Sequence, residues 1–216
     1  MNAVTPELVL QAYAVGLFPM AETRDDDSLY WIDPKERGIL PLDEIHVPKS
    51  LRKVLRRGVF DVRVDTDFAQ VLEQCRRQAD NRPESWINDQ IAELYNALHA
   101  MGRAHSVECW RDGALVGGLY GVSLGGAFFG ESMFTRVRDA SKVALIHLCA
   151  RLKRGGYMLL DCQFITEHLK RFGAVEIPRA EYRERLAKAL KVEGRFDYGF
   201  GAADLETFLQ SNTQTS

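Results

Sequence analysis

The feature that most constrains the fold is the succession of strand-like and helix-like segments over residues 60–164. Residues 105–112, 115–125, 127–134 and 157–164 have the apolar or alternating pattern of β-strands, and glycines mark the turn between the second and the third. The segments between them have helical periodicity. We therefore expect an α+β fold in which helices pack on a mixed, largely antiparallel sheet.

The sequence pattern of the N-terminal part predicts a separate small unit. Thr5 is placed to cap a helix, Pro6 suits its first position, and Gly16 ends it. A strand-like segment interrupted by proline follows. We predict a small N-terminal domain over residues 1–36 and a larger domain over residues 37–216.

Composition excludes several classes of protein. The chain has 216 residues, 46% of them hydrophobic and 27% charged, which is typical of a globular protein. Its four cysteines form no C-x-x-C pair and its five histidines lack metal-ligand spacing, so we expect no metal and no disulfide framework. No apolar run reaches the ~18 residues of a membrane span and the N-terminus lacks a signal-peptide pattern, so we expect a cytoplasmic protein that does not enter a membrane.

A predicted helix near residue 50 carries a basic face. Its cations, at helical spacing on one side, are Lys49, Arg52, Lys53, Arg56 and Arg57. Such a face can be an ordinary solvated surface, or it can bind a phosphate backbone by releasing counterions. The sequence leaves both readings open.

Polar and aromatic residues in apolar surroundings are the other candidates for a site. Glu131 stands among large apolar side chains, so it is hydrogen-bonded, exposed, or placed to bind a cation. Asp161 and Gln163 share one face of a strand and form either a structural network or a polar active site. Trp86 and Tyr13 either fill the core or stack on a ligand such as a nucleobase.

Several motifs together resemble one family. FFGESMF at 128–134, ASK at 140–142 and DCQ at 161–163, with further matching segments from about Leu10 to Leu190, resemble leucyl/phenylalanyl-tRNA-protein transferases. The resemblance implies an enzyme that moves Leu, Phe or Met from aminoacyl-tRNA to the α-amino group of proteins with N-terminal Arg or Lys, which marks them for degradation under the N-end rule. It also implies a small N-terminal domain followed by a GNAT-like acyltransferase domain, and no metal, ATP or coenzyme A.

The resemblance also assigns roles to residues. It implies that Glu131 attracts the cationic N-terminal residue of the acceptor and that Asp161 and Gln163 lie beside the reacting carbonyl. Trp86 matches an aromatic residue near the terminal adenosine, with Met20 where the family often has an aromatic residue; we expect Tyr13 at the same site. The basic helix matches the patch attributed to tRNA binding. Positions around the pocket for the transferred side chain are matched by Leu119, Phe128, Leu145, Leu148, Leu152 and Leu160.

The residue types suit aminoacyl transfer. An aminoacyl ester is already activated, so no strong base is needed for attack by an α-amine. The amide oxygen of Gln163 can accept a hydrogen bond from the amine, while Asp161 either fixes that amide or takes the proton.

The sequence also allows two alternative functions. A coenzyme-A-dependent N-acyltransferase should carry a glycine-rich Q/R-x-x-G-x-G/A loop, which we do not find. A non-catalytic RNA-binding module would explain the basic helix but not the three polar residues.

Overall fold

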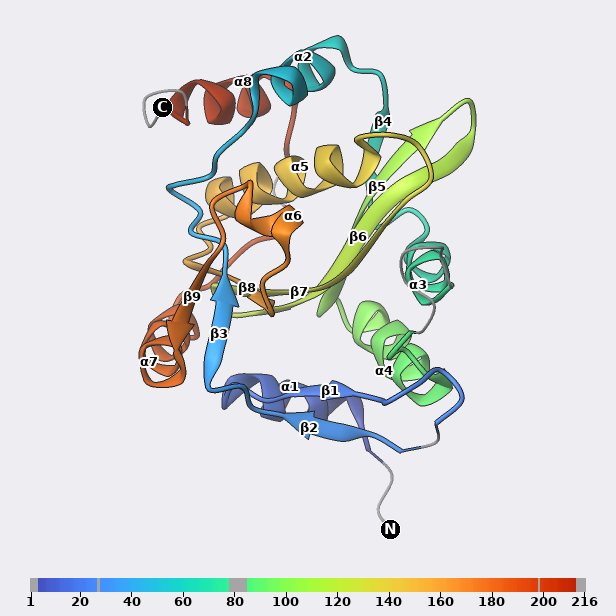
Figure 1. The fold of residues 1–216 in the computed structure, drawn as a ribbon, viewed down its shortest axis with the longest axis vertical. Helices are drawn as coiled ribbons and strands as arrows, with labels where there is room; N and C mark the ends of the chain where they lie inside the picture. Colours follow the sequence, from blue (N-terminus) through green and yellow to red (C-terminus); the bar gives the residue numbers. More distant parts are fainter. Residues whose placement is uncertain (1–3, 27, 78–84, 198, 213–216) are drawn as a thin grey trace.

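The computed structural model describes residues 4–26, 28–77, 85–197 and 199–212. A seven-stranded sheet with strand order β4-β5-β6-β7-β8-β3-β9 forms its centre (Figure 1). Its strands are β3 (Glu36–Ile39), β4 (Asp61–Val64), β5 (Ala104–Arg111), β6 (Ala114–Leu124), β7 (Ala127–Thr135), β8 (Leu159–Gln163) and β9 (Val175–Pro178). The helices are α1 (Pro6–Ala14), α2 (Lys49–Arg57), α3 (Phe68–Arg76), α4 (Asp89–Ala100), α5 (Ala140–Arg154), α6 (Glu167–Lys170), α7 (Arg179–Ala189) and α8 (Ala202–Ser211).

The strand connections explain the pairing. Strands β5, β6 and β7 follow one another as an antiparallel meander, and Gly125 makes the β6–β7 turn at φ +58°, a backbone conformation that favours glycine. Helix α5 crosses over and returns the chain so that β8 pairs with β7 in parallel. Strand β3 is antiparallel to both β8 and β9. The predicted α+β class with a mixed, largely antiparallel sheet is confirmed.

Two apolar clusters cover the two faces of the sheet. Helices α2, α5 and α8 contribute to one cluster, and helices α1, α3, α4 and α7 contribute to the other. Figure 1 shows these two groups of helices on opposite sides of the sheet. The strands near the middle of the sheet are therefore buried on both faces, which agrees with their long apolar runs.

The N-terminal unit consists of α1 and a two-stranded sheet of β1 (Phe18–Met20) and β2 (Tyr30–Ile32). Thr5 caps α1 by accepting a hydrogen bond from Leu8, as predicted. Strand β3 begins at Glu36, so the last residue of the predicted domain 1–36 lies in the large sheet; residues 1–3 and 27 of that range are outside the described residues. The division into two domains stays a prediction.

Three elements were not predicted from the sequence: β1, β9 and α8. Strand β9 is four residues long, and its partner among the described residues is β3, more than 130 residues away in the chain. Helix α8 follows a glycine-rich segment but has an apolar face of Leu205, Phe208 and Leu209. Within the described ranges, no helix has the length and apolar character needed to cross a bilayer, and no group of three or more His, Cys, Asp or Glu residues could hold a metal.

Candidate active site

The site lies where the pairing of β7 with β8 ends. The parallel register joins Ala127–Phe129 to Leu159–Asp161 and stops there. Glu131 and Gln163 each lie two residues beyond the last pair, so their side chains border the same opening between the two strands. A cavity of about 410 Å³ lies at this opening. Its lining consists of Trp86, Leu119, Tyr120, Gly130, Glu131, Ser132, Met133, Leu145, Leu148, Leu160, Cys162, Phe164, Thr166, His168 and Leu169.

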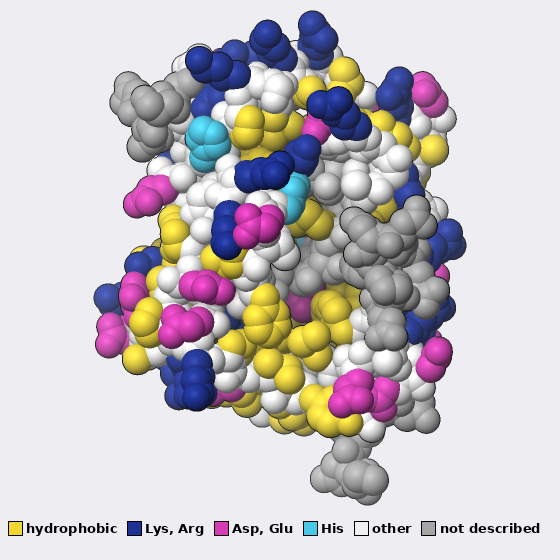
Figure 2. Space-filling view, viewed as in Figure 1, with side chains coloured by type: hydrophobic (Ala, Val, Ile, Leu, Met, Phe, Trp, Pro, Cys, Tyr) yellow, Lys and Arg dark blue, Asp and Glu magenta, His cyan; other side chains and the backbone are white. Residues whose placement is uncertain are grey.

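The cavity is mainly apolar, as a pocket for an uncharged side chain should be. Four of the six predicted pocket residues line it: Leu119, Leu145, Leu148 and Leu160. They come from β6, α5 and β8. Figure 2 shows hydrophobic side chains gathered over the middle and lower part of the face in view.

The structure corrects the prediction for Phe128 and Leu152. Both side chains are fully buried in the cluster beneath the cavity. The ring of Phe128 stacks on Phe196 with centroids 5.4 Å apart, while Leu152 lies one turn beyond Leu148, away from the cavity. These two residues support the pocket wall without lining it.

Glu131 accepts hydrogen bonds from two buried tyrosines. Tyr13 on α1 donates to Oε1 at 2.7 Å and Tyr95 on α4 donates to Oε2 at 2.8 Å. Loss of solvation raises the pKa of Glu131 to about 7, although these two hydrogen bonds lower it. The carboxyl group therefore changes charge near neutral pH, at the boundary between the apolar cavity and the N-terminal unit.

Tyr13 does not stack on a ligand, contrary to our expectation for an adenosine site. Its side chain has no exposed surface, its ring packs on Phe129 with centroids 4.5 Å apart, and its hydroxyl is held by Tyr95 and Glu131. The physical reason is that α1 packs this residue against α4 and the sheet. Tyr13 instead holds the carboxylate of Glu131 through a hydrogen bond.

Asp161 forms a buried ion pair that the sequence did not reveal. Arg37 on β3 donates to it through Nε at 3.0 Å and through Nη2 at 2.6 Å. The hydroxyl of Tyr182 and the backbone N–H of Gln163 also donate to it, at 2.7 and 2.8 Å. With both oxygens occupied, Asp161 holds the backbone of Gln163, whose φ is +54°, and this arrangement favours a positioning role over proton transfer.

Gln163 lies next to a smaller cavity of about 100 Å³. Its Nε2 donates to Glu131 Oε1 at 3.2 Å, which leaves the amide oxygen to accept from a ligand. This cavity shares four lining residues with the larger one, so the two are contiguous. Its lining is Phe18, Met20, Trp86, Glu131, Cys162, Gln163 and Phe164.

Met20 and Trp86 lie together at the smaller cavity. The backbone N–H of Ala21 donates to the carbonyl of Trp86 at 3.2 Å, which ties the end of β1 to the loop that carries Trp86. Both side chains are half-buried. The structure thus brings together two of the three residues expected at the adenosine.

The basic face of α2 is smaller than predicted. Arg52 is buried and donates to the carbonyls of Val47, Leu209 and Asn212, because α8 packs over that side of the helix. Arg56 is exposed and pairs with Glu206 at 2.8 Å. Arg52 is therefore a structural residue, and the prediction that it contacts RNA is corrected. The exposed cations of α2 are Lys49, Lys53, Arg56 and Arg57.

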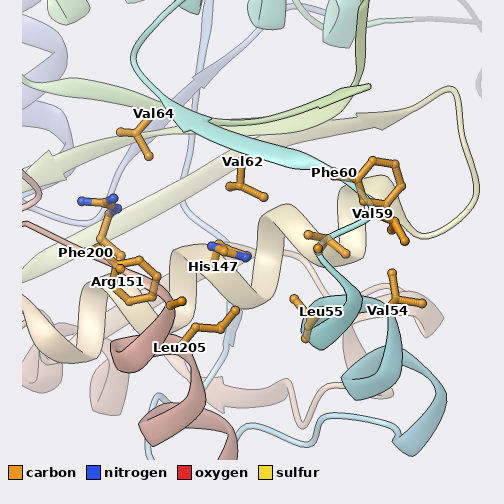
Figure 3. A pocket seen from close by; sticks show the side chains of 14 residues that line it. Val54, Leu55, Val59, Phe60, Val62, Val64, His147, Arg151, Phe200 and Leu205 are labelled. Atoms are coloured by element: carbon orange, nitrogen blue, oxygen red, sulfur yellow. The ribbon is translucent and has the colours of Figure 1, made fainter. Parts of the chain in front are cut away.

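A separate cavity of about 290 Å³ lies between α2, β4, α5 and α8 (Figure 3). Aliphatic side chains line most of it. His147 of α5 borders it, and burial lowers the pKa of this histidine to about 4, so it is neutral. None of the polar residues predicted for catalysis borders this cavity, and we do not place the reaction there.

The lining of the larger cavity points to a class of enzyme. Its thiol, Cys162, has a pKa raised well above the ordinary value by burial and by the nearby Asp161, so it is not an ionised nucleophile. An apolar pocket that ends at hydrogen-bonding groups fits an acyl-group transferase that takes up an already activated donor.

Comparison with known proteins agrees with this class. The family model for leucyl/phenylalanyl-tRNA protein transferase matches residues 39–187, and the model for the N-terminal domain of the same family matches residues 2–35. Leucyl/phenylalanyl-tRNA–protein transferase of Paramagnetospirillum magneticum is 59% identical over 91% of this chain and 94% of its own. The protein of that name from Maricaulis maris is 56% identical over the whole of both chains.

The chain belongs to the leucyl/phenylalanyl-tRNA protein transferase family and is an aminoacyltransferase. The family name implies aminoacyl-tRNA and protein substrates. Among solved structures, L-PGS from Bacillus licheniformis aligns with 92% of this chain and 60% of its own at a TM-score of 0.38 and 14% identity. A likeness this distant supports no inference.

Proposed function

We propose that this enzyme transfers Leu, Phe or Met from aminoacyl-tRNA to the α-amino group of proteins with N-terminal Arg or Lys, in the cytoplasm, and so marks them for degradation. The observation that carries the proposal is the apolar cavity that ends at Glu131. The cavity offers an uncharged pocket for the side chain of the transferred amino acid, and Glu131 offers a carboxylate for the cationic N-terminal residue of the acceptor.

The donor would occupy both cavities. An apolar volume of about 410 Å³ is ample for a Leu, Phe or Met side chain, and its Leu-rich wall makes no polar demand on that side chain. The terminal adenosine would lie at the smaller cavity, where Trp86 offers a ring face and Met20 offers apolar contact area. The ester carbonyl would then lie near Gln163, where the two cavities meet.

The acceptor would be recognised by charge. Ionised Glu131 in apolar surroundings attracts a guanidinium or ammonium group more strongly than a solvated carboxylate would. Binding of that cation also favours the ionised form of Glu131, which counteracts the burial that raises its pKa.

The chemistry requires orientation more than acid–base strength. The acceptor α-amine has an ordinary pKa of about 7.7–8.0, so a substantial neutral fraction exists near neutral pH. The amide oxygen of Gln163 would accept a hydrogen bond from the attacking amine and aim its lone pair at the ester carbon. As the C–N bond forms, the ester C–O bond breaks, the terminal ribose of the RNA leaves, and its oxygen gains the proton that the amine loses. Asp161, Arg37 and Tyr182 would hold Gln163 in the required place.

A transfer assay tests the proposal. Labelled Leu, Phe and Met on tRNA are offered to model proteins that differ only in their N-terminal residue: Arg, Lys, Ala or Glu. We expect transfer from all three donors to the Arg and Lys acceptors, little to the others, and none from acetyl-coenzyme A.

Equal transfer to the Ala acceptor would refute the acceptor assignment. Transfer from a charged amino acid such as Asp on tRNA, at a rate comparable to Leu, would refute the assignment of the apolar cavity.

A further inference from the structure

A basic groove lies beside the candidate site and has no role in the function proposed so far. It is a cavity of about 560 Å³ between the end of α3, the end of β7 and the start of α5. Its lining residues are Gln74, Arg77, Met133, Phe134, Thr135, Arg136, Arg138, Asp139, Ser141, Lys142 and His168.

Positive charge predominates in this groove. Asp139 is the carboxylate in the lining of the groove, and it forms ion pairs with two cations, Lys142 at 2.6 Å and Arg138 at 3.6 Å. Arg77 pairs with Glu73 at 3.5 Å. The guanidinium of Arg136 donates at 3.1 and 2.9 Å to the amide oxygen of Gln74, a neutral group. An incoming anion would therefore meet more cations than carboxylates.

The groove is contiguous with the aminoacyl cavity. Met133 and His168 line both. The Nε2 atom of His168 is buried, with no hydrogen-bond partner among the described residues. Burial, Lys142 and Arg171 all lower the pKa of His168, so its ring is neutral and can serve a ligand as donor or acceptor.

One wall of the groove, the start of α5, lies on the face of the sheet that α2 also covers, whereas the other wall, the end of α3, lies on the opposite face. In Figure 1, α2 and the loop from β7 to α5 both lie above the sheet, and Figure 2 shows Lys and Arg side chains scattered over the upper part of that face. A strand that reaches from α2 to the apolar cavity could therefore pass over positive side chains.

We propose that the basic groove binds the phosphodiester groups of the single-stranded 3′ end of the RNA donor. This inference rests on the donor placement proposed above. Guanidinium groups match phosphate geometry through paired hydrogen bonds, and three of the four cations are arginines. A protein acceptor that begins with Arg or Lys would be repelled by the same cations, so the observations favour the RNA.

The test compares two unreactive donor analogues. One is an amide-linked leucyl-adenosine, and the other is the same molecule extended at its 5′ side by two cytidylates, which adds two phosphodiesters. In the wild type we expect the extension to tighten binding about tenfold or more, because hydrogen bonds to charged groups are strong. The gain should fall with salt at roughly 0.7 log units per log unit of salt for each contact.

The variant Arg136→Gln/Lys142→Gln should lose most of that gain and keep its affinity for the unextended analogue. A matched loss of two charges elsewhere, Arg185→Gln/Lys188→Gln on α7, should keep the full gain. Circular dichroism of both variants checks that they are folded.

Each other outcome has a distinct meaning. If the wild type gains nothing from the cytidylates, or the variant keeps the gain, the groove does not bind RNA phosphates. If the variant instead weakens binding of acceptor peptides with acidic residues after the first position, the groove belongs to the protein substrate. If the unextended analogue does not bind the wild type at all, the donor placement itself is wrong.

Discussion

The side chains that donate hydrogen bonds to Glu131 come from three distant parts of the chain. Tyr13 and Tyr95 reach it from two helices, and Gln163 reaches it from the neighbouring strand. Burial raises the pKa of Glu131, the two tyrosines lower it by donating to the ionised form, and the net result is a pKa of about 7. The affinity for a cationic acceptor should therefore increase as the pH rises through about 7.

Removing both donors should move that transition. In Tyr13→Phe/Tyr95→Phe the carboxylate loses two hydrogen bonds, its pKa rises further, and acceptor binding should shift to higher pH. Calorimetric titration of a peptide with N-terminal Arg, repeated from pH 6 to pH 8.5, measures the midpoint. Tyr157→Phe, which removes a buried hydroxyl bonded to Ser123, is the control. An unchanged midpoint would separate the tyrosines from the ionisation of Glu131.

The proposed adenosine site leads to different predictions for Trp86 and Met20. Base–aromatic stacking contributes about 1–3 kcal/mol per base, so Trp86→Ala should weaken binding of a minimal aminoacyl-adenosine by about tenfold, whereas Met20→Ala should weaken it less. Met20→Trp should keep or improve the affinity. Inhibition constants for the amide analogue measure all three. Were Trp86→Ala harmless, Trp86 would be a packing residue only.

At the scale of secondary structure, β3 and β8 are joined by the ion pair between Arg37 and Asp161. The two side chains are 1% and 0% exposed. Asp161→Ala leaves a buried guanidinium unpaired and should lower the free energy of unfolding by roughly 3–5 kcal/mol. Arg37→Met/Asp161→Leu should lose less than the sum of the two single variants, Arg37→Met and Asp161→Leu, because it removes both charges.

In the double variant Arg37→Met/Asp161→Leu, kcat should not recover even though part of the stability does. The double variant still lacks the acceptor for the backbone N–H of Gln163, so kcat should remain low. Denaturant unfolding and steady-state kinetics on the same samples measure both quantities. Additive losses of stability would show that the two charges are not coupled.

Helix α2 contains cations of two kinds. Lys49 and Lys53 are exposed, so Lys49→Ala/Lys53→Ala should weaken tRNA binding and flatten its salt dependence by about 0.9 per lost contact if the RNA duplex behaves like B-DNA. Arg52→Ala leaves buried carbonyls of α8 without their donor and should lower stability by roughly 1–3 kcal/mol. Filter binding at several salt concentrations and thermal unfolding distinguish the two effects. A salt slope equal to wild type in the lysine variant would make α2 an ordinary surface.

Arg52 also shows why one sequence prediction was wrong. Helical spacing places it correctly on the side of Lys49 and Arg56. Helix α8, which was not predicted, packs against this side of α2 and supplies a carbonyl that accepts from Arg52. The apolar spacing of Leu205, Phe208 and Leu209 was the available signal.

At the scale of the whole molecule, the local part of the fold was predictable and the long-range part was not. Caps and periodicity located most helices and the β5–β6–β7 meander, because those signals lie within a few residues. The insertion of β3 between β8 and β9 joins segments more than 100 residues apart. Arg37 was missed for that reason, since its role appears only when β3 lies beside Asp161.

The candidate site depends on the same long-range arrangement. Glu131, Gln163, Trp86 and four pocket leucines were named from motifs, and the structure brings them to one opening between β7 and β8. Tyr13 was assigned to a ligand because an exposed aromatic and a buried one look alike in sequence. Packing of α1 against α4 decides between the two.

The proposed function depends most on Glu131, which we expect to recognise the positive charge of the acceptor's N-terminal side chain. The most direct test measures kcat/KM for two acceptor peptides that differ only in an N-terminal arginine or its neutral isostere citrulline, in wild type and in Glu131→Gln. Hydrogen bonds to charged groups contribute about 1.5–3 kcal/mol, so the wild type should prefer arginine by about tenfold or more. In Glu131→Gln that ratio should fall to near one, with the affinity for the donor unchanged, whereas Glu167→Gln, at an exposed carboxylate on α6, should keep it. A preference for arginine that persists undiminished in Glu131→Gln would contradict the account.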